Sequence, residues 1–373
     1  MPAYLDHAAS SPLRPEALDA MLPWFSEQHA NPTASHRRGR RARQALDEAR
    51  AVLAEATGFE RGDVVFTGGG TESDNLAIGR CHASGSVVVG ATEHPAVLEP
   101  AKLQNALIAP VDGNGVVSPE ALANLVDETT EVVSVMAVNN ETGTVQDVSA
   151  IASAVHERAP GALVHSDAVQ ALPWLDLPST TVGVDMLSVT GHKIGGPQGV
   201  GAVLVRDGRM PAPMLVGGGQ ERDRRAGTQN VPGIVGFAAA VRASLDDHNE
   251  RLARIDRLAT RLLDGLMEQV DGLRPTVERS VRVPGIVHVC IPGLQSEPLL
   301  FLLDEDDLAC SAASSCASGA QGASHVLDAM GVDALNTAPL RLSLGWSTTD
   351  DDIDEALRLI PAAVGKLRGG SRG

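Results

Sequence analysis

The chain has 373 residues, of which 43% are hydrophobic and 21% charged, and its formal net charge at pH 7 is −17. This balance is typical of a soluble globular enzyme and excludes a mostly disordered chain, while the acidic charge and the 2% of aromatic residues disfavour direct binding of nucleic acid. No apolar run approaches the roughly 20 residues that span a bilayer, and the first ten residues show no basic region followed by an apolar one. We therefore expect a cytoplasmic protein without a membrane segment.

The length also predicts two domains, because a single hydrophobic core stops growing at roughly 250 to 300 residues. We expect a large domain over residues 15–245 and a smaller one built from residues 1–14 and 246–373. A basic cluster at residues 35–44 is expected to begin a helix or to contact a second subunit. The four cysteines include no CxxC pair, so neither a disulfide framework nor a metal site is expected.

Short β-branched runs alternate with helical patterns from about residue 60 to residue 206, and each run predicts a strand. Strands separated by helices of this length indicate crossover units on a mainly parallel sheet, covered on both faces. Ligands of such sheets bind at the carboxyl ends of the strands. Polar segments follow the strands here and should converge on one site: GGGTESDN, TEHPAV, NNETG, HSDAVQ and TGHK.

The second part of the chain predicts a smaller α+β arrangement. Residues 230–270 indicate one long helix with an apolar face formed by Ile234, Phe237, Val241 and Leu245. Strands are expected at 283–293, 308–310 and 338–345, and helices at 296–305 and 324–331. A last helix should begin with the acidic run 348–354, which suits the positive end of a helix dipole.

Lys193 is one of only three lysines, with Lys102 and Lys366, among 30 basic residues. It lies between two strand-like apolar runs. A lysine amine can lose its proton when it is desolvated and then act as a base or nucleophile, whereas a guanidinium stays charged. The scarcity of lysine therefore favours a chemical role for Lys193 over the alternative, an ordinary surface lysine in a loop.

Three further segments offer partners for this lysine. Residues 66–75 run from a strand through glycines into a helix start, which suits a phosphate, and they lack the lysine of a nucleoside-triphosphate loop. Asp167, at a strand end, is either a helix cap or the partner of a cation. His94 precedes a proline at an expected helix start, where a structural role is favoured for the residue taken alone. Together, a phosphate cradle, an acid able to pair with a pyridinium nitrogen and a scarce lysine are the parts that pyridoxal 5'-phosphate requires.

With these parts in place, the chain resembles the cysteine desulfurases of the NifS/IscS kind, in the class-V aminotransferase superfamily of fold-type I pyridoxal-phosphate enzymes. The likeness covers nearly the whole chain, from YLDHAA to LRLSLGWSTTDDDID, and includes GGTESDNLAI, TGHKIGGPQGVGA, GGGQERDRRAGTQN and SSCASG. It implies an α/β fold with a mainly parallel seven-stranded sheet in the large domain and a smaller α+β domain that carries the catalytic cysteine.

The resemblance also assigns roles at the cofactor. Lys193 would be the Schiff-base lysine, Asp167 would keep the pyridine nitrogen protonated, and Gln170 would bond the phenolic oxygen. His94 would stack on the ring and take part in catalysis, and Asn140 would lie near the cofactor. The phosphate would be contacted by Gly70, Thr71, Thr190 and His192, and by Thr228 of a second subunit, which makes a homodimer necessary for activity.

At the substrate, Asn31 and Arg341 would grip the carboxylate of L-cysteine, for which a bidentate guanidinium is suited. Cys316, in a small-residue segment expected to form a flexible loop, would take the sulfur as a persulfide while L-alanine leaves. The sulfur would pass to an acceptor protein such as an iron–sulfur scaffold or a thiolation enzyme.

The chain departs from the family pattern at several positions. Thr190 stands where serine is common, and Gln220 stands where many relatives have histidine. Cys310 is expected to be a spectator rather than a resolving thiol. The alternatives are a selenocysteine lyase or aminotransferase on the same fold, a non-catalytic sulfur-transfer scaffold and, more remotely, a nucleotide-binding module.

Overall fold

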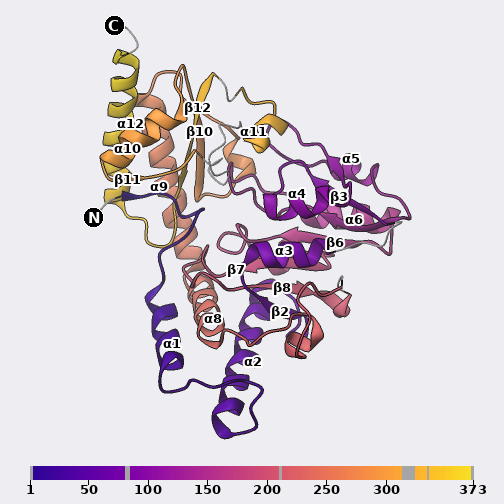
Figure 1. Ribbon diagram of the computed structural model, residues 1–373. Coiled ribbons are helices and arrows are strands. Elements are labelled where there is room, and N and C mark those ends of the chain that lie inside the picture. The colour runs from indigo at the N-terminus through magenta and orange to yellow at the C-terminus, as the bar shows by residue number, and fades with distance from the viewer. Residues whose placement is uncertain (1–2, 80–84, 210–211, 313–323, 334–335, 371–373) are drawn as a thin grey trace.

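The computed structural model describes residues 3–79, 85–209, 212–312, 324–333 and 336–370. Its largest element is a seven-stranded sheet with the order β2-β8-β7-β6-β5-β3-β4 (Figure 1). The strands are β2 (Val64–Thr67), β3 (Ser86–Gly90), β4 (Leu107–Ala109), β5 (Thr130–Ser134), β6 (Leu163–Asp167), β7 (Met186–Thr190) and β8 (Gly201–Val205). Neighbouring strands from β4 to β7 are parallel, and β8 is antiparallel to both β7 and β2. The expected mainly parallel seven-stranded sheet is therefore confirmed.

Both faces of this sheet are covered, as the apolar character of its strands requires. Helices α3 (Gly70–Ile78) and α4 (Pro95–Lys102) pack on one face, against a cluster of valines and Met186. The other face carries the main core, to which α2 (Arg37–Thr57), α6 (Val148–Arg158) and α8 (Val231–Asp246) contribute buried side chains. Helix α1 (Pro15–Phe25) packs on α8, while α5 (Pro119–Ala123) packs on α6. The short helix α7 (Leu177–Thr180) contacts α2.

The predicted long helix over 230–270 is wrong in one respect, because the chain breaks at Asp247 into α8 and α9 (His248–Gln269). Helix α8 packs on α1 and α2, whereas α9 packs on α12 (Asp350–Gly370), and one straight helix cannot serve both neighbours. At the break, the Asp247 carboxylate pairs with Arg14 and Arg251, each at 2.9 Å or less. Leu245, expected on the buried face, is 37% exposed.

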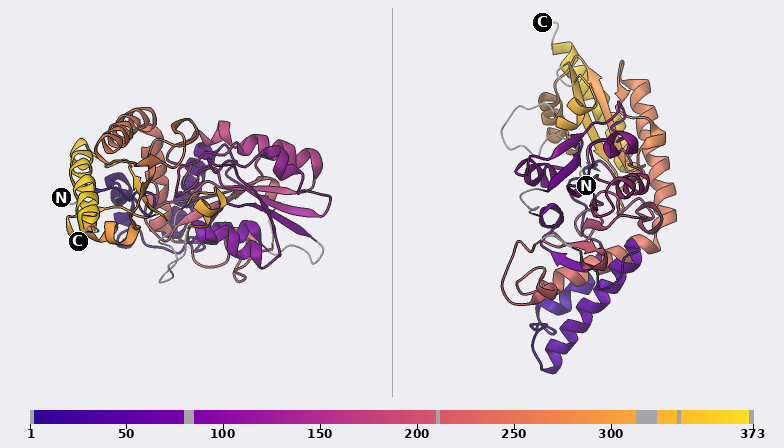
Figure 2. Two further views of the ribbon diagram at one scale, coloured as in Figure 1. Left: turned by 90° about the horizontal axis from the view of Figure 1, so that it is seen from above. Right: turned by 90° about the vertical axis from the view of Figure 1, so that its right-hand side faces the viewer.

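The second part of the chain forms two small sheets beside the first. Strand β10 (Ile286–Pro292) pairs antiparallel with β12 (Thr337–Ser343) and β9 (Arg274–Pro275), and β1 (Ala3–Tyr4) pairs with β11 (Leu308–Ala309). The N-terminal strand thus lies with the C-terminal part of the chain, beside α12 (Figures 1 and 2). The remaining helices are α10 (Ser296–Glu305), α11 (His325–Ala329) and the 3₁₀ turns η1 (Arg206–Gly208), η2 (Gln220–Asp223) and η3 (Arg279–Val281).

Most of the expected elements are present within a few residues of their predicted bounds. The basic cluster at 35–44 begins α2, with His36 as its N-cap. The acidic first turn of α12 is also present. None of the helices in the described ranges combines the length and apolar character needed to cross a membrane. The proposed domain boundaries at 14/15 and 245/246 stay a prediction.

Candidate active site

The segments that carry the predicted cofactor residues meet at the carboxyl edge of the parallel strands. Asp167 is the last residue of β6, and Lys193 follows β7 by three residues. Helix α3, which begins just after β2, packs across β6, β7 and β8. The charge of Lys193 acts on both Asp167 and His94, which places the three groups near one another.

The predicted phosphate cradle lies where β2 runs into α3. Gly69 has a φ of +150°, a conformation that side chains rarely adopt, and α3 begins at Gly70. A Cβ atom on Gly70 would come within 2.8 Å of the Val169 side chain and 3.9 Å of Thr190 Cβ. Only glycine therefore permits this close approach. The first amide groups of α3, with the exposed Thr71, offer the positive end of a helix dipole to an anion.

Asp167 is a buried carboxyl group whose negative charge is only partly compensated by its surroundings. It is 5% exposed, and its Oδ1 accepts a hydrogen bond from Val169 N at 2.8 Å. Burial raises the pKa of Asp167 to about 6, although Val169 N–H and the Lys193 charge oppose this shift. Within the described part of the chain, Asp167 has no ion-pair partner. This contact closes a turn and not a helix, so the predicted helix cap is not formed. The contact uses only one oxygen, so a cation can still be bound by the other.

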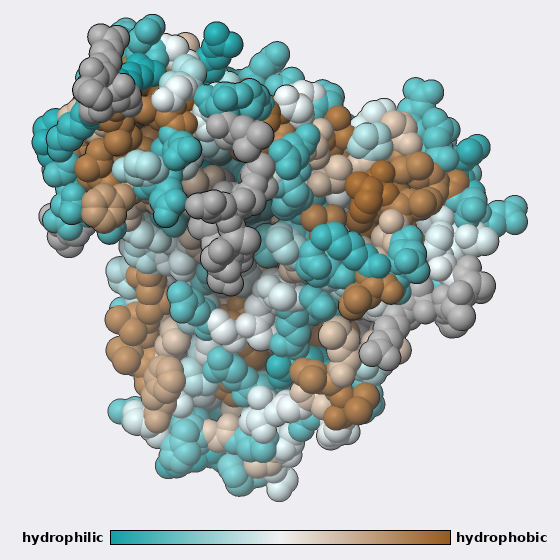
Figure 3. All heavy atoms as spheres, turned by 45° about the horizontal axis from the view of Figure 1, so that its top comes forward, coloured by the Kyte–Doolittle hydropathy of each residue, from teal (hydrophilic) through white to brown (hydrophobic). Residues whose placement is uncertain are grey.

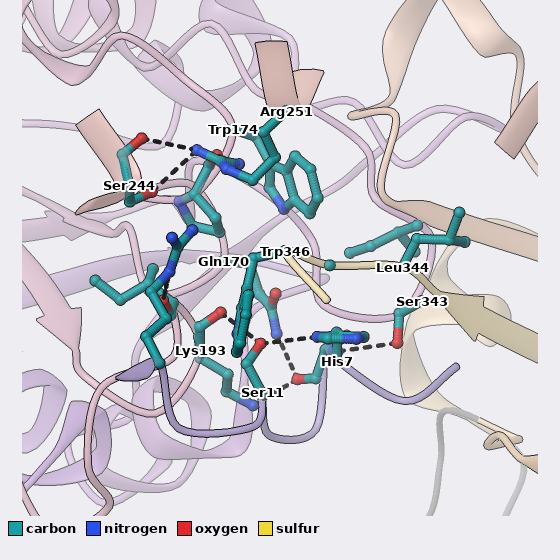
Figure 4. A pocket seen from close by; sticks show the side chains of 16 residues that line it. His7, Ser11, Gln170, Trp174, Lys193, Ser244, Arg251, Ser343, Leu344 and Trp346 are labelled. Carbon is teal, nitrogen blue, oxygen red and sulfur yellow. Dashed lines mark hydrogen bonds between the residues drawn. The ribbon is translucent and has the colours of Figure 1, made fainter. Parts of the chain in front are cut away.

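Lys193 is held by the segment that follows β1. Its Nζ donates to the carbonyl oxygens of Ala8 at 2.5 Å and Ala9 at 2.8 Å. Gln170 Nε2 donates to the same Ala8 oxygen at 2.7 Å, and Ser11 Oγ donates to the Lys193 carbonyl at 3.0 Å. Lys193, Gln170 and Ser11 are among the side chains that line a small cavity (Figure 4). The cavity measures about 20 Å³, which is room for about one water molecule.

These contacts of the N-terminal segment were missed by sequence reasoning. The acceptors are backbone carbonyl groups, which every residue has, so no residue type marks them. The only available signal is the resemblance of YLDHAA to the family, which carries no information on the contact with Lys193.

His94 is the N-cap of α4, as its place before a proline predicts. Its Nδ1 accepts a hydrogen bond from Ala96 N at 3.1 Å, so the neutral ring carries its proton on Nε2. Burial lowers the pKa of His94 to about 4, with help from the charges of Lys193 and His325. The ring is therefore neutral at physiological pH and can present a flat face to a ligand.

Thr190 and His192 flank the strand end before Lys193. Thr190 Oγ1 donates to Val200 O at 3.1 Å and is 1% exposed, so its hydroxyl hydrogen is engaged within the protein. His192 Nδ1 lies 3.4 Å from Ser10 Oγ, and burial lowers its pKa to about 4. Their contacts with a phosphate stay a prediction, and Thr190 would have to turn its hydroxyl to donate to a ligand.

Arg341, on β12, comes to the site from the second part of the chain. Its Nη2 pairs with Asp6 Oδ1 at 2.8 Å and its Nη1 donates to Asn140 O at 2.8 Å. Its Nε is buried without a hydrogen-bond partner. This guanidinium is fixed in position and retains an unused donor, which suits the binding of a carboxylate.

Three predicted residues are not brought to this site. Asn31 lies in the exposed connection between α1 and α2, at the end of the molecule away from β12 (Figure 1), and its Oδ1 accepts from Thr33 N and Oγ1. Thr228 is exposed, beyond η2. Cys316 lies outside the described residues, within 313–323.

Two departures from the family pattern have structural explanations. Gln220 Oε1 accepts from Gly227 N at 3.0 Å and so ties the two ends of its own loop together. Burial, together with Asp6 and Asp304, raises the pKa of Cys310 to about 12. This thiol stays protonated at neutral pH, which supports its expected role as a spectator.

Comparison with known proteins assigns this arrangement to a family. The family model described as aminotransferase class-V matches residues 3–356. The chain is 38% identical to an IscS-like cysteine desulfurase of Mycobacterium tuberculosis, over 98% of this chain and 97% of that protein. It is 37% identical to the cysteine desulfurase IscS of Methanosarcina thermophila, over 98% of this chain and 92% of that protein.

The fold agrees with these sequence comparisons. A solved structure described as a NifS-like protein superposes with a TM-score of 0.89 at 33% identity, covering 98% of this chain and all of that one. A NifS-like protein from Rickettsia africae also gives a TM-score of 0.89, at 28% identity.

Proposed function

This chain belongs to the class-V aminotransferase family, and from that premise we propose that it is a cysteine desulfurase that uses pyridoxal 5'-phosphate. It converts L-cysteine to L-alanine and keeps the sulfur as a persulfide on Cys316. The names of full-length relatives at 37 to 38% identity support this activity.

The observation that carries the cofactor assignment is the buried Asp167 carboxyl near Lys193. A carboxylate removed from water is costly unless a cation faces it. A pyridinium nitrogen would supply that cation and would lower the pKa of Asp167 again, which keeps the carboxylate ionised at neutral pH. The glycine turn before α3 suits the phosphate, and Gln170 suits the phenolic oxygen. When bound, pyridoxal phosphate supplies an electron sink for bond breaking at the substrate.

The residues of the chain would divide the remaining work as follows. Lys193 would hold the cofactor, and its amine would move the proton at the substrate Cα. The Ala8 and Ala9 carbonyls would accept hydrogen bonds from this amine while it is not bound to the cofactor. Arg341, already fixed by Asp6 and the Asn140 carbonyl, takes the substrate carboxylate through its unused Nε. The neutral His94 ring would pack against the cofactor ring.

Cys316 would remove the sulfur. Its thiolate attacks the substrate sulfur, an S–S bond forms, and the C–S bond breaks with its electron pair left on the three-carbon product. Protonation of that carbon yields L-alanine, and the persulfide remains on Cys316 for an acceptor protein. We propose an iron–sulfur scaffold or a thiolation enzyme as acceptor, and a cytoplasmic location.

We further propose that a homodimer completes the site. Asn31 and Thr228 are exposed, and we infer that they reach an active site from another subunit. Apolar side chains are exposed near both: Leu22 and Phe25 on α1, and Val216 in the segment before η2. Figure 3 shows apolar surface on the side of α1. A second copy would bury this surface and bring Thr228 to its partner's phosphate.

The test of the cofactor assignment is covalent trapping. Purified protein is incubated with pyridoxal phosphate, reduced with borohydride, digested and analysed by mass spectrometry. We expect the modified peptide to contain Lys193, to vanish in Lys193→Ala, and to persist in the matched control Lys102→Ala. A modified lysine elsewhere, or none in the wild type, would refute the assignment.

A further inference from the structure

A layer of polar side chains lies directly beneath the proposed cofactor site. On the sheet face covered by α3 and α4, side chains two residues apart along a strand share the same face. The apolar side chains of Val132, Leu163 and Met186 come first on β5, β6 and β7. Two residues later on the same strands come Ser134, His165 and Ser188, and Asp167 follows His165 at the edge.

These polar side chains form one hydrogen-bonded row across three strands. His165 Nδ1 lies 2.9 Å from Ser134 Oγ, and its Nε2 lies 2.9 Å from Ser188 Oγ. Ser134 Oγ donates to Glu93 Oε2 at 3.3 Å, and Glu93 Oε1 accepts from Met136 N at 2.5 Å. Both ring nitrogens of His165 are thus engaged by hydroxyl groups, and the residue is fully buried.

Asp74 of α3 closes the row at its other end, against Ser188. It is 1% exposed, and its Oδ1 has no hydrogen-bond partner. The distance from this oxygen to His165 Nε2 is 3.7 Å, too long for a hydrogen bond. Apart from His165, no cationic side chain of the described residues lies within ion-pair distance of Asp74 or Glu93. We call Asp74, Glu93, Ser134, His165 and Ser188 the polar layer.

Three carboxyl groups, those of Asp74, Glu93 and Asp167, therefore meet in one buried region. They cannot all ionise, because like charges at short range raise one another's cost of ionisation. Asp167 has the Val169 N–H and the nearby Lys193 charge to support its anion, whereas Asp74 has one oxygen without any donor. A protonated Asp74 can also donate to Ser188 and so satisfy a row in which neutral His165 donates at one nitrogen and accepts at the other.

We propose that Asp74 is held in its protonated form, and that the polar layer is a positioning device that leaves Asp167 as the carboxylate facing the pyridine nitrogen. This inference rests on the proposed function, since it assumes that Asp167 meets that nitrogen. Burial raises the pKa of Asp74 and of Glu93 well above their usual range, which agrees with the geometry. Asp74 and His165 are both buried, so we expect them to act on the cofactor through Asp167.

The protonation state is tested by infrared spectroscopy of the cofactor-free protein at pH 7. Asp74→Asn should remove part of the carbonyl band of protonated carboxylic acids. The matched control is Asp185→Asn, because Asp185 is also buried but forms an ion pair with the Arg209 guanidinium at 2.7 Å and lies 3.0 Å from His156 Nε2. We expect this control to leave the band unchanged. An unchanged band in Asp74→Asn would overturn the proposal.

The positioning role is tested on the pyridoxal-phosphate-loaded protein. Asp74→Asn should keep the pH midpoint of the cofactor's absorption change, because Asn copies a neutral carboxyl group. A moved midpoint would mean that Asp74 carries charge and would overturn the proposal. His165→Leu should move the midpoint and weaken pyridoxal phosphate binding about tenfold, the effect of one lost buried hydrogen bond. Ser188→Ala, a smaller change, should move it in the same direction, and wild-type midpoints in both variants would refute the role.

Failure of the proposed function gives a different result. A wild type that binds no pyridoxal phosphate would refute the cofactor assignment, while the infrared comparison of Asp74→Asn with Asp185→Asn would still report the charge of Asp74.

Discussion

Replacing Asp167 with asparagine should stabilise the cofactor-free protein and prevent the cofactor from stabilising it further. The pKa of Asp167 is raised from its ordinary value of 3.8 to about 6, chiefly by burial. One pKa unit corresponds to about 1.4 kcal/mol, so ionised Asp167 costs the folded protein about 3 kcal/mol at pH 7. The asparagine side chain would carry no charge and could still accept the hydrogen bond from Val169 N.

The sign of the pH dependence follows from linkage. Between pH 3.8 and about 6 the folded state holds a proton that the unfolded state has lost, so the free energy of unfolding falls as the pH rises through this interval. The advantage of Asp167→Asn should therefore be near zero below pH 3, about 1.6 kcal/mol at pH 5 and about 3 kcal/mol at pH 7.

The assay is urea unfolding at pH 5 and pH 7, at one protein concentration, with and without pyridoxal phosphate. With cofactor at about a hundred times its dissociation constant, the wild type should gain about 2.7 kcal/mol. Asp167→Asn should gain much less, because it has lost the charge that faces the pyridinium nitrogen. A cofactor-free variant that is less stable than the wild type at pH 7, or equally affected at both pH values, would refute this reasoning.

Three further outcomes are expected. Gly70→Ala should cost about 1 to 3 kcal/mol of stability and weaken pyridoxal phosphate binding, because the added Cβ would meet Val169. The control Gly365→Ala lies at an open helical position and should raise the melting temperature. The opposite order of melting temperatures in thermal unfolding would contradict this. Arg341→Lys should raise the KM for L-cysteine about tenfold or more with a smaller change in kcat, since lysine has no equivalent of the Nε–H that Arg341 offers to the carboxylate. An unaltered KM would exclude the proposed contact. Cys310→Ala should leave alanine formation within about twofold, and a large loss would make this thiol a participant.

The sequence was sufficient for the parts of the site that lie on strand ends. Asp167 and Lys193 follow apolar runs that can only be buried strands, and the carboxyl ends of parallel strands meet at one edge whatever the details of packing. The scarcity of lysine then singled out Lys193. His94 as a helix start followed from the proline after it.

Other features depend on tertiary structure and could not be predicted in this way. Strand β4 (Leu107–Ala109) is apolar but only three residues long, and so short a run does not distinguish a strand from other structure by its periodicity. The break at Asp247 allows α8 and α9 to pack against different helices. The hydrogen bonds from Lys193 to the carbonyl groups of Ala8 and Ala9 join residues that are 184 to 185 positions apart in the sequence. In the polar layer, Glu93, Ser134 and His165 come from separate segments, so the row exists only in the fold.

The most direct test of the account is the formation of L-alanine from L-cysteine, measured in the presence of a thiol reductant with pyridoxal-phosphate-loaded protein. Wild type and Cys316→Ser are compared side by side, with the absorption spectrum of each recorded to show equal cofactor loading. The account predicts alanine from the wild type and none from Cys316→Ser. Equal rates from both proteins would move the chemistry away from Cys316 and contradict a persulfide mechanism.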